Sequence, residues 1–125
     1  MSFEAAVHAK AVRLDSLALN MTAASGSGHP TTALSLGHIV TCLLYEGMRW
    51  VPENPGLNTS DRLVLSEGHA VPIVYAAFAD LGVMVGKPGE ERPFPVEDLD
   101  HFCEPHSVPV SHPNPMPPPT FFVSA

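Results

Sequence analysis

The sequence is poor in charge and has no long apolar run. Only 15 % of its 125 residues are charged, and the six basic residues are scattered among 13 acidic ones. Without a basic cluster, the chain has no electrostatic footprint for nucleic acid or for an anionic lipid surface. No window approaches the roughly 18 apolar residues that a membrane helix needs. We therefore expect neither nucleic-acid nor membrane partners.

Cysteine is also scarce. The two cysteines, Cys42 and Cys103, lie far apart in the sequence. The first residues, MSFEAAVHAKAVRL, lack the basic segment followed by an apolar run that is typical of a signal peptide. Two cysteines in a chain without an export signal predict free thiols rather than a disulfide. The expected location is the cytoplasm.

Proline, in contrast, is abundant near the end of the chain. There are 14 prolines, about twice the average usage, and half of them fall between Pro105 and Pro119. Hydrophobic residues make up 45 % of the chain, which argues against wholesale disorder. We predict a globular segment over residues 1–104 and a proline-rich, irregular tail over residues 105–125. The triple proline at 117–119 favours an extended polyproline conformation.

Hydrophobic spacing predicts a helical chain with one strand. Apolar residues at three- and four-residue intervals indicate a helix, and a short apolar run between turn signals indicates a buried strand. Pro30 and Pro72 suit the first turns of two of these helices. The predicted segments are helices over 3–24, 31–46 and 70–81, a strand over 62–66, a loop over 86–95 and a short helix over 96–102.

This order of elements predicts the α/β class. A parallel sheet needs several strands, and this sequence offers a single convincing one with no predicted ladder partner. We therefore expect the N-terminal part of a larger parallel-sheet domain that is mostly helical within these residues.

Three segments combine small, flexible residues with histidine. They are SGSGHP at 25–30, SEGH at 66–69 and SHPNP at 111–115. In the first two, a Gly-His pair stands at the start of a predicted helix, where free backbone N–H groups favour anions. A histidine there can donate a hydrogen bond to a phosphate or move a proton near neutral pH. Ser27 or His29 could cap the second helix.

Two longer segments resemble the thiamine-diphosphate-binding region of the transketolase family. They are SGSGHPTTALSLGHIVTCLLYEGMRW and NTSDRLVLSEGHAVPIVYAAFADLG. The family has an SGHP segment that opens a helix, followed by N-x-x-D-R-x-V-L-S-x-G-H. A third family element, Gly-His-Pro, resembles Ser111-His112-Pro113, with Ser in place of Gly. The resemblance covers roughly residues 5 to 116. Deoxyxylulose-phosphate synthase is the related alternative, and the SGHP and LSEGHA segments favour transketolase.

The resemblance implies roles for particular residues. His29 would face the substrate and the reactive thiazolium and assist proton transfer, and His112 would bind donor-substrate oxygens. His69, with Gly68, would contact the cofactor diphosphate. The implied reaction is transfer of a two-carbon ketol unit from a ketose phosphate to an aldose phosphate, a step of the pentose phosphate pathway. The family uses thiamine diphosphate with Mg²⁺ or Ca²⁺ and is commonly dimeric.

Several family elements are missing from this sequence. They are the TGxLGQG segment, the Gly-Asp-Gly metal motif with its following Asn, and the later domain that supplies a catalytic glutamate. No metal-ligating residue is assigned. We expect a truncated, frameshifted or split gene product, inactive alone. The alternative is a non-catalytic binding or assembly module that needs a separately encoded chain or pairs with itself. A third hypothesis is a diphosphate binder that uses His29 and His69 alone.

The remaining motifs have simpler explanations. His8 and His38 match no family site and are expected at the surface or in an interface. The spacing of His101, His106 and His112 fits neither one helical face nor a zinc finger, so we expect no dedicated metal site there. The proline-rich tail could dock to an SH3-like or WW-like groove, but the chain has no basic residue after Arg92 to orient it.

Overall fold

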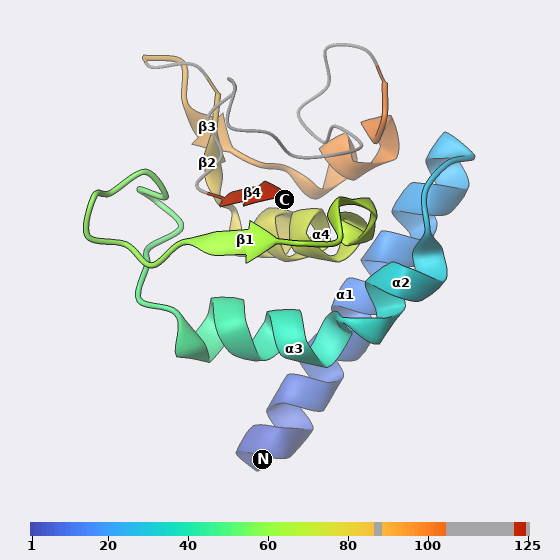
Figure 1. The fold of residues 1–125 in the computed structure, drawn as a ribbon, viewed down its shortest axis with the longest axis horizontal. Coiled ribbons are helices and arrows are strands. Elements are labelled where there is room, and N and C mark those ends of the chain that lie inside the picture. Colours follow the sequence, from blue (N-terminus) through green and yellow to red (C-terminus); the bar gives the residue numbers. More distant parts are fainter. Residues whose placement is uncertain (87–88, 105–121, 125) are drawn as a thin grey trace.

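The fold is mainly helical, with two pairs of short strands (Figure 1). A computed structural model describes residues 1–86, 89–104 and 122–124. The elements in chain order are α1 (Phe3–Ser25), α2 (Pro30–Ser35), α3 (Gly37–Cys42), the π-helical turn η1 (Leu43–Gly47), β1 (Leu63–Leu65), the 3₁₀ turn η2 (Gly68–Ala70), α4 (Pro72–Leu81), β2 (Met84–Val85), β3 (Arg92–Pro93), the 3₁₀ helix η3 (Val96–His101) and β4 (Phe122–Ser124).

Helix α1 is bounded by its own capping residues. The Ser2 hydroxyl accepts a hydrogen bond from the Ala5 amide at 3.2 Å, which satisfies one of the free N–H groups of the first turn. At the other end, Gly26 adopts φ +62°, a left-handed conformation that glycine takes at little cost. The predicted helix over 3–24 is therefore confirmed.

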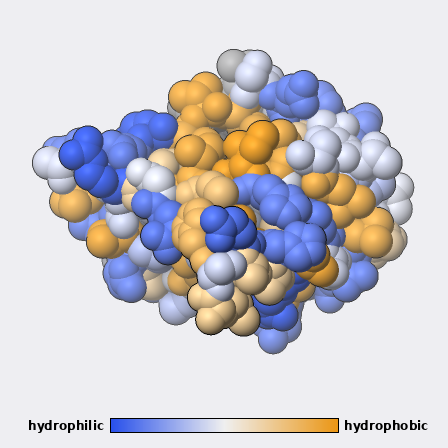
Figure 2. All heavy atoms as spheres, turned by 90° about the horizontal axis from the view of Figure 1, so that it is seen from below, coloured by the Kyte–Doolittle hydropathy of each residue, from blue (hydrophilic) through white to orange (hydrophobic). Residues whose placement is uncertain are grey.

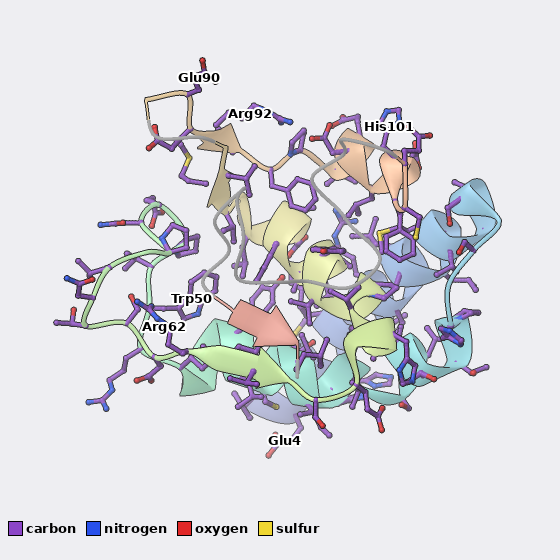
Figure 3. All side chains as sticks on the ribbon, turned by 45° about the horizontal axis from the view of Figure 1, so that its top comes forward. Glu4, Trp50, Arg62, Glu90, Arg92 and His101 are labelled. Carbon is purple, nitrogen blue, oxygen red and sulfur yellow. The ribbon has the colours of Figure 1, made fainter. Side chains whose placement is uncertain are left out.

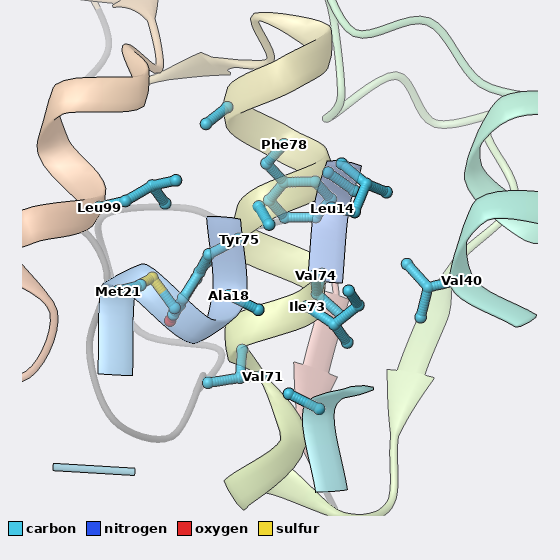
Figure 4. Close-up of a cluster of buried hydrophobic side chains, with 14 of the residues drawn as sticks. Leu14, Ala18, Met21, Val40, Val71, Ile73, Val74, Tyr75, Phe78 and Leu99 are labelled. Carbon is cyan, nitrogen blue, oxygen red and sulfur yellow. The ribbon is translucent and has the colours of Figure 1, made fainter. Parts of the chain in front are cut away.

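Helix α4 lies at the centre of the core (Figure 4). Every residue from Pro72 to Ala79 is buried, so this helix is covered on all sides. Leu14 and Met21 of α1 and Leu99 of η3 belong to the same apolar cluster. Pro72 occupies the first turn and Gly82, at φ +64°, ends the helix, as the sequence predicts.

The segment predicted as one helix over 31–46 is divided into α2, α3 and η1. The prediction of a continuous helix is therefore wrong. The first break falls at Leu36, where φ is −99° and ψ is 0°. The Leu36 amide donates to the Ala33 carbonyl, three residues back, at 3.1 Å. This tighter turn ends α2. It precedes Gly37, which packs directly against Asp15 of α1.

The strands correct two further predictions. Strand β1 lies within the predicted 62–66 segment but has a partner, because β4 pairs with it in parallel and Leu63 stands opposite Phe122. The sequence predicted no such partner, and the predicted irregular tail contains this strand. The predicted loop over 86–95 includes β3, which forms an antiparallel pair with β2. The short helix predicted over 96–102 is the 3₁₀ helix η3.

An ion-pair cluster around Asp80 connects α1, η1 and α4. Lys10 Nζ lies 2.8 Å from Asp80 Oδ2 and Arg13 Nε lies 3.0 Å from Oδ1. The Tyr45 hydroxyl donates to Oδ2 at 2.6 Å. Burial alone would raise the pKa of Asp80, but hydrogen bonds from Lys10, Tyr45 and Arg13 outweigh it, and the pKa lies below its ordinary value. Burial, together with the neighbouring carboxylate, raises the pKa of Tyr45.

The surface has no concentrated positive charge in the described part of the chain. Arg62 and Arg92 project from different parts of the molecule (Figure 3), and Arg92 is paired with Asp98 at 2.7 Å. Apolar and polar areas alternate on the face shown in Figure 2. Within the described residues, none of the helices combines the length and apolar character needed to cross a bilayer. Cys42 and Cys103 are free thiols, as predicted.

Candidate functional site

The first candidate residue, His29, is placed by the turn between α1 and α2. It occupies the N-cap position of α2, with φ −125° and ψ 78°, and Pro30 begins the helix. The imidazole makes no capping hydrogen bond, so the predicted capping role of His29 is not observed. The ring is exposed and available to a ligand.

Gly28 gives this turn its shape. Its φ of +108° is strained for any residue with a side chain. A Cβ added there would lie 2.8 Å from Thr22 Cγ2 and 3.2 Å from Phe102 Cε1, so the backbone passes where only glycine fits. From the sequence alone, Gly28 indicates no more than a flexible turn. Its packing against Thr22 and Phe102 depends on contacts between distant segments.

A local hydrogen bond supports the same turn. The Ser25 hydroxyl accepts from the Ser27 amide at 3.2 Å and lies 3.1 Å from the Thr22 carbonyl, to which it can donate. Serine side chains commonly stabilise turns in this way. The SGSG segment at 25–28 is therefore a hydrogen-bonded turn that directly precedes His29.

The second candidate residue, His69, lies between β1 and α4. It sits in η2, where the Ala70 amide donates to the Glu67 carbonyl at 2.8 Å. Gly68 is buried and His69 is half-buried. This is the position expected from the strand-Gly-His-helix pattern, at the end of a strand that pairs in parallel.

The structure brings His29 and His69 together. Their ring centroids are 5.0 Å apart and the planes are inclined by 76°, an edge-to-face arrangement. Two imidazoles in this geometry offer N–H donors and lone pairs at one place, which suits oxygen-rich anions and proton transfer. His112, the third candidate, lies outside the described residues.

The described residues form no site for a hard divalent ion. No group of three or more His, Cys, Asp or Glu side chains in residues 1–86, 89–104 and 122–124 is arranged to hold a metal. Mg²⁺ and Ca²⁺ prefer carboxylate and carbonyl oxygens, and the His29–His69 pair supplies only nitrogen. The His29–His69 pair therefore suits an anionic ligand such as a diphosphate. It does not suit the Mg²⁺ or Ca²⁺ ion that would accompany that anion.

Comparison with known proteins places these residues in a family. A family model described as "Transketolase, thiamine diphosphate binding domain" matches residues 5–119, which includes both Gly-His segments. The chain belongs to the transketolase family. The resemblance found in the sequence is thus confirmed, and the mostly helical fold with its short strands is consistent with a part of that thiamine-diphosphate-binding domain.

Individual transketolases match the chain over part of its length. Human transketolase is 42 % identical over 72 residues, which is 58 % of this chain and 12 % of the human protein. Bovine transketolase-like protein 2 is 44 % identical over 70 residues, 56 % of this chain and 11 % of that protein. The 6-deoxy-6-sulfo-D-fructose transketolase subunit SqwG of Clostridium sp. (strain MSTE9) is 38 % identical over 87 residues, 70 % of this chain and 28 % of that subunit. The match thus spans about a tenth of the two mammalian transketolase-family proteins.

Proposed function

We propose that this chain supplies part of a thiamine-diphosphate site for transketolase-type ketol transfer. The observation that carries the proposal is the meeting of His29 and His69, from two separate segments, at a ring separation of 5.0 Å. Both histidines stand at positions that match the motifs of the transketolase family. The reaction would move a two-carbon ketol unit from a ketose phosphate to an aldose phosphate.

Each histidine has a distinct proposed role. His69 donates a hydrogen bond to the cofactor diphosphate. The neighbouring Gly68 is buried, and its backbone lies close to the same diphosphate. His29 is more exposed, so it faces the substrate and exchanges protons with it. His112 binds oxygens of the donor sugar. When bound, thiamine diphosphate supplies the stabilisation of the carbanion, and the protein orients the reacting groups.

The cation of the family enzymes would be held by residues other than those described. The printed sequence contains no Gly-Asp-Gly motif, and the described residues offer no ligand group. We therefore propose that Mg²⁺ or Ca²⁺ binds the diphosphate through a further part of the site, and we assign it no ligand in this chain. We propose the cytoplasm as the location.

Calorimetric titration with thiamine diphosphate tests the cofactor role. We expect the 125-residue chain to bind it and His69→Ala to weaken binding at least tenfold, because the diphosphate loses a donor. His8→Ala is the matched control, since it removes an exposed histidine from the opposite end of α1. Absence of binding by the parent chain, or equal binding by His69→Ala, would contradict the assignment.

We further propose that the isolated chain does not catalyse ketol transfer. The missing metal motif and the missing catalytic glutamate of the family both argue for this. The assay uses purified chain with xylulose 5-phosphate, ribose 5-phosphate, thiamine diphosphate and Mg²⁺. Turnover above the background of His29→Ala would overturn the proposal.

A second proposal is that the chain is one component of a divided transketolase. The relative SqwG is itself described as a subunit, and 70 % of this chain aligns with it. The chain would then act as a binding or assembly module, either with a separately encoded chain or as a homodimer. Co-purification from the native host, followed by mass spectrometry, tests this. A transketolase-type partner carrying the Gly-Asp-Gly motif supports it, whereas a chain recovered as a free monomer contradicts it.

A further inference from the structure

The turn that carries His29 is held by a side chain from a distant segment. Gly28 lies between Thr22, near the end of α1, and Phe102, which follows η3. Thr22 belongs to the helix that precedes the turn, and its carbonyl accepts a hydrogen bond from the Ser27 amide at 3.3 Å. Phe102 is therefore the closest contact of Gly28 that comes from another part of the chain.

Phe102 is itself firmly held. It is only 2 % exposed, and its amide donates to the Leu99 carbonyl at 3.2 Å at the end of η3. Its ring meets that of Tyr75, in the middle of α4, edge to face, with the ring centroids 6.3 Å apart. A buried aromatic ring packed on a second buried ring has little freedom to move. Phe102 therefore offers Gly28 a fixed surface that is joined to α4.

His69 is fixed relative to the same tyrosine. The Tyr75 amide donates to the Val71 carbonyl at 3.0 Å, and the Val71 amide donates to the Gly68 carbonyl at 3.2 Å. These backbone hydrogen bonds join η2, which contains His69, to the start of α4. Helix α2 also contacts η2. The position of His29 relative to His69 therefore depends on the turn from which α2 starts.

Gly28 alone does not fix this turn. Glycine adopts positive φ about as readily as negative φ, so its φ of +108° must be maintained by neighbouring groups. We propose that Phe102 is a positioning residue, whose ring holds the turn so that the His29 ring meets that of His69. A side chain at 102 that is smaller or more flexible leaves space beside Gly28, and the turn relaxes. The consequence for cofactor binding rests on the proposed function of the two histidines.

The contact between the two histidine rings can be measured without the cofactor. The experiment records nuclear Overhauser cross-peaks between the ring protons of His29 and His69 in the full 125-residue chain. His29→Gln and His69→Gln assign the signals. We expect a cross-peak in the parent chain, because the ring centroids are 5.0 Å apart and the rings lie edge to face. Phe102→Leu should lose this cross-peak.

Phe94→Leu is the matched control. Phe94 is 1 % exposed and meets the Tyr75 ring edge to face at the same centroid separation of 6.3 Å. It follows β3, which lies away from the turn between α1 and α2 (Figure 1). This variant loses a similar buried ring and should keep the cross-peak. The proposal is overturned if Phe102→Leu keeps the cross-peak, if both variants lose it, or if the parent chain lacks it.

Far-UV circular dichroism of each variant checks that the helices are retained. If Phe102→Leu does not fold, Phe102→Met takes its place, because methionine fills the space with a flexible, unbranched chain in a swap that cores tolerate better. Loss of the cross-peak in folded Phe102→Met supports the positioning role, and its retention overturns it.

Calorimetry with thiamine diphosphate measures the consequence for the cofactor. Phe102→Leu should bind at least about threefold more weakly than the parent chain, because the two imidazoles no longer offer their N–H groups at one place. Phe94→Leu should bind as the parent chain does. If the parent chain itself does not bind, the proposed function fails while the cross-peaks still decide the role of Phe102. Equal binding by Phe102→Leu and the parent would overturn the link to the cofactor.

Discussion

The position of His29 depends on the backbone of the residue before it. Gly28 has φ +108° and no room for a Cβ, because Thr22 and Phe102 close the space around it. Through this glycine, the end of α1 and the end of η3 are packed against the turn that carries His29. A residue of the proposed catalytic site is thus placed by contacts with two elements that supply no site residue.

Gly28→Ala should therefore destabilise the chain by about 3 kcal/mol, since backbone strain and overpacking each cost roughly 1–3 kcal/mol. Gly26→Ala is the matched control in the same turn, with φ +62° and nothing within 4 Å of the added Cβ. Its cost should be about 1 kcal/mol, from backbone strain alone. Urea unfolding of the three proteins measures both values. Equal costs for the two variants would show that the contacts with Thr22 and Phe102 do not matter.

A second glycine sets the distance between α1 and α3. Gly37→Ala would drive a Cβ into the Asp15 carboxylate, and we expect it to cost about 2 kcal/mol of unfolding free energy. In an Asp15→Ala background the space is open, so the same change should cost less than about 0.5 kcal/mol. A double-mutant cycle measures this coupling. Additive effects would contradict direct contact between the two residues.

At the scale of elements, the Asp80 cluster joins helices that are distant in sequence. Asp80 of α4 is only 10 % exposed and is bound by Lys10 and Arg13 of α1 and by Tyr45 of η1. Its carboxylate is thus a buried charge with three donors. Removal of such a charge leaves the donors without an acceptor and costs more than an exposed ion pair contributes.

Asp80→Asn is expected to lower the free energy of unfolding by about 2 kcal/mol at neutral pH. The folded-state pKa of Asp80 is lowered below its ordinary 3.8. Its contribution is therefore fully present above that value and is lost as pH falls through the folded-state pKa. The difference between the parent chain and Asp80→Asn should shrink over this acidic range.

Urea unfolding at a series of pH values from neutral to strongly acidic measures this difference. Asp98→Asn is the matched control, because Asp98 pairs with Arg92 at an exposed part of the surface. It should cost less than about 1 kcal/mol. A difference between parent and Asp80→Asn that does not change with pH would contradict the role of the charge.

Elements set by local sequence were predicted well, and those set by distant contacts were not. Helices α1 and α4 have periodic apolar residues and glycine at their ends, so their bounds could be predicted. The break at Leu36 was missed because it accompanies the packing of Gly37 on Asp15. Strand β4 was missed because it pairs with β1 across more than 50 residues and follows a run of prolines.

The same distinction applies to the histidines. The Gly-His motifs predicted His29 and His69 as functional residues. The structure adds that their rings lie edge to face. The contact between His8 and His38 could not be predicted, since no motif connects two histidines on separate helices. The pairing depends on how α1 crosses α3, which is a property of the packed helices.

At the scale of the whole molecule, one apolar cluster connects the site to the rest of the chain. The cluster contains residues of α1, α3, α4, β1 and η3. Trp50 packs beside it, with its ring centroid 6.3 Å from that of Phe78 and its Nε1 donating to the Leu44 carbonyl at 2.9 Å. It is the only tryptophan in the sequence, so its fluorescence reports on this part of the core alone.

The shared core predicts cooperative unfolding. Far-UV circular dichroism follows mainly α1 and α4, whereas tryptophan fluorescence follows the region around Trp50. If the elements are stabilised by one core, the two signals should give the same midpoint and slope in urea. Val74→Ala, in the centre of α4, should shift both midpoints equally, because it creates a cavity costing about 2–3 kcal/mol. Separate midpoints, or a shift in only one signal, would mean that the helices fold as independent units. The His29–His69 pair, whose two segments meet through the contact between α2 and η2, would then need a partner chain to hold it together.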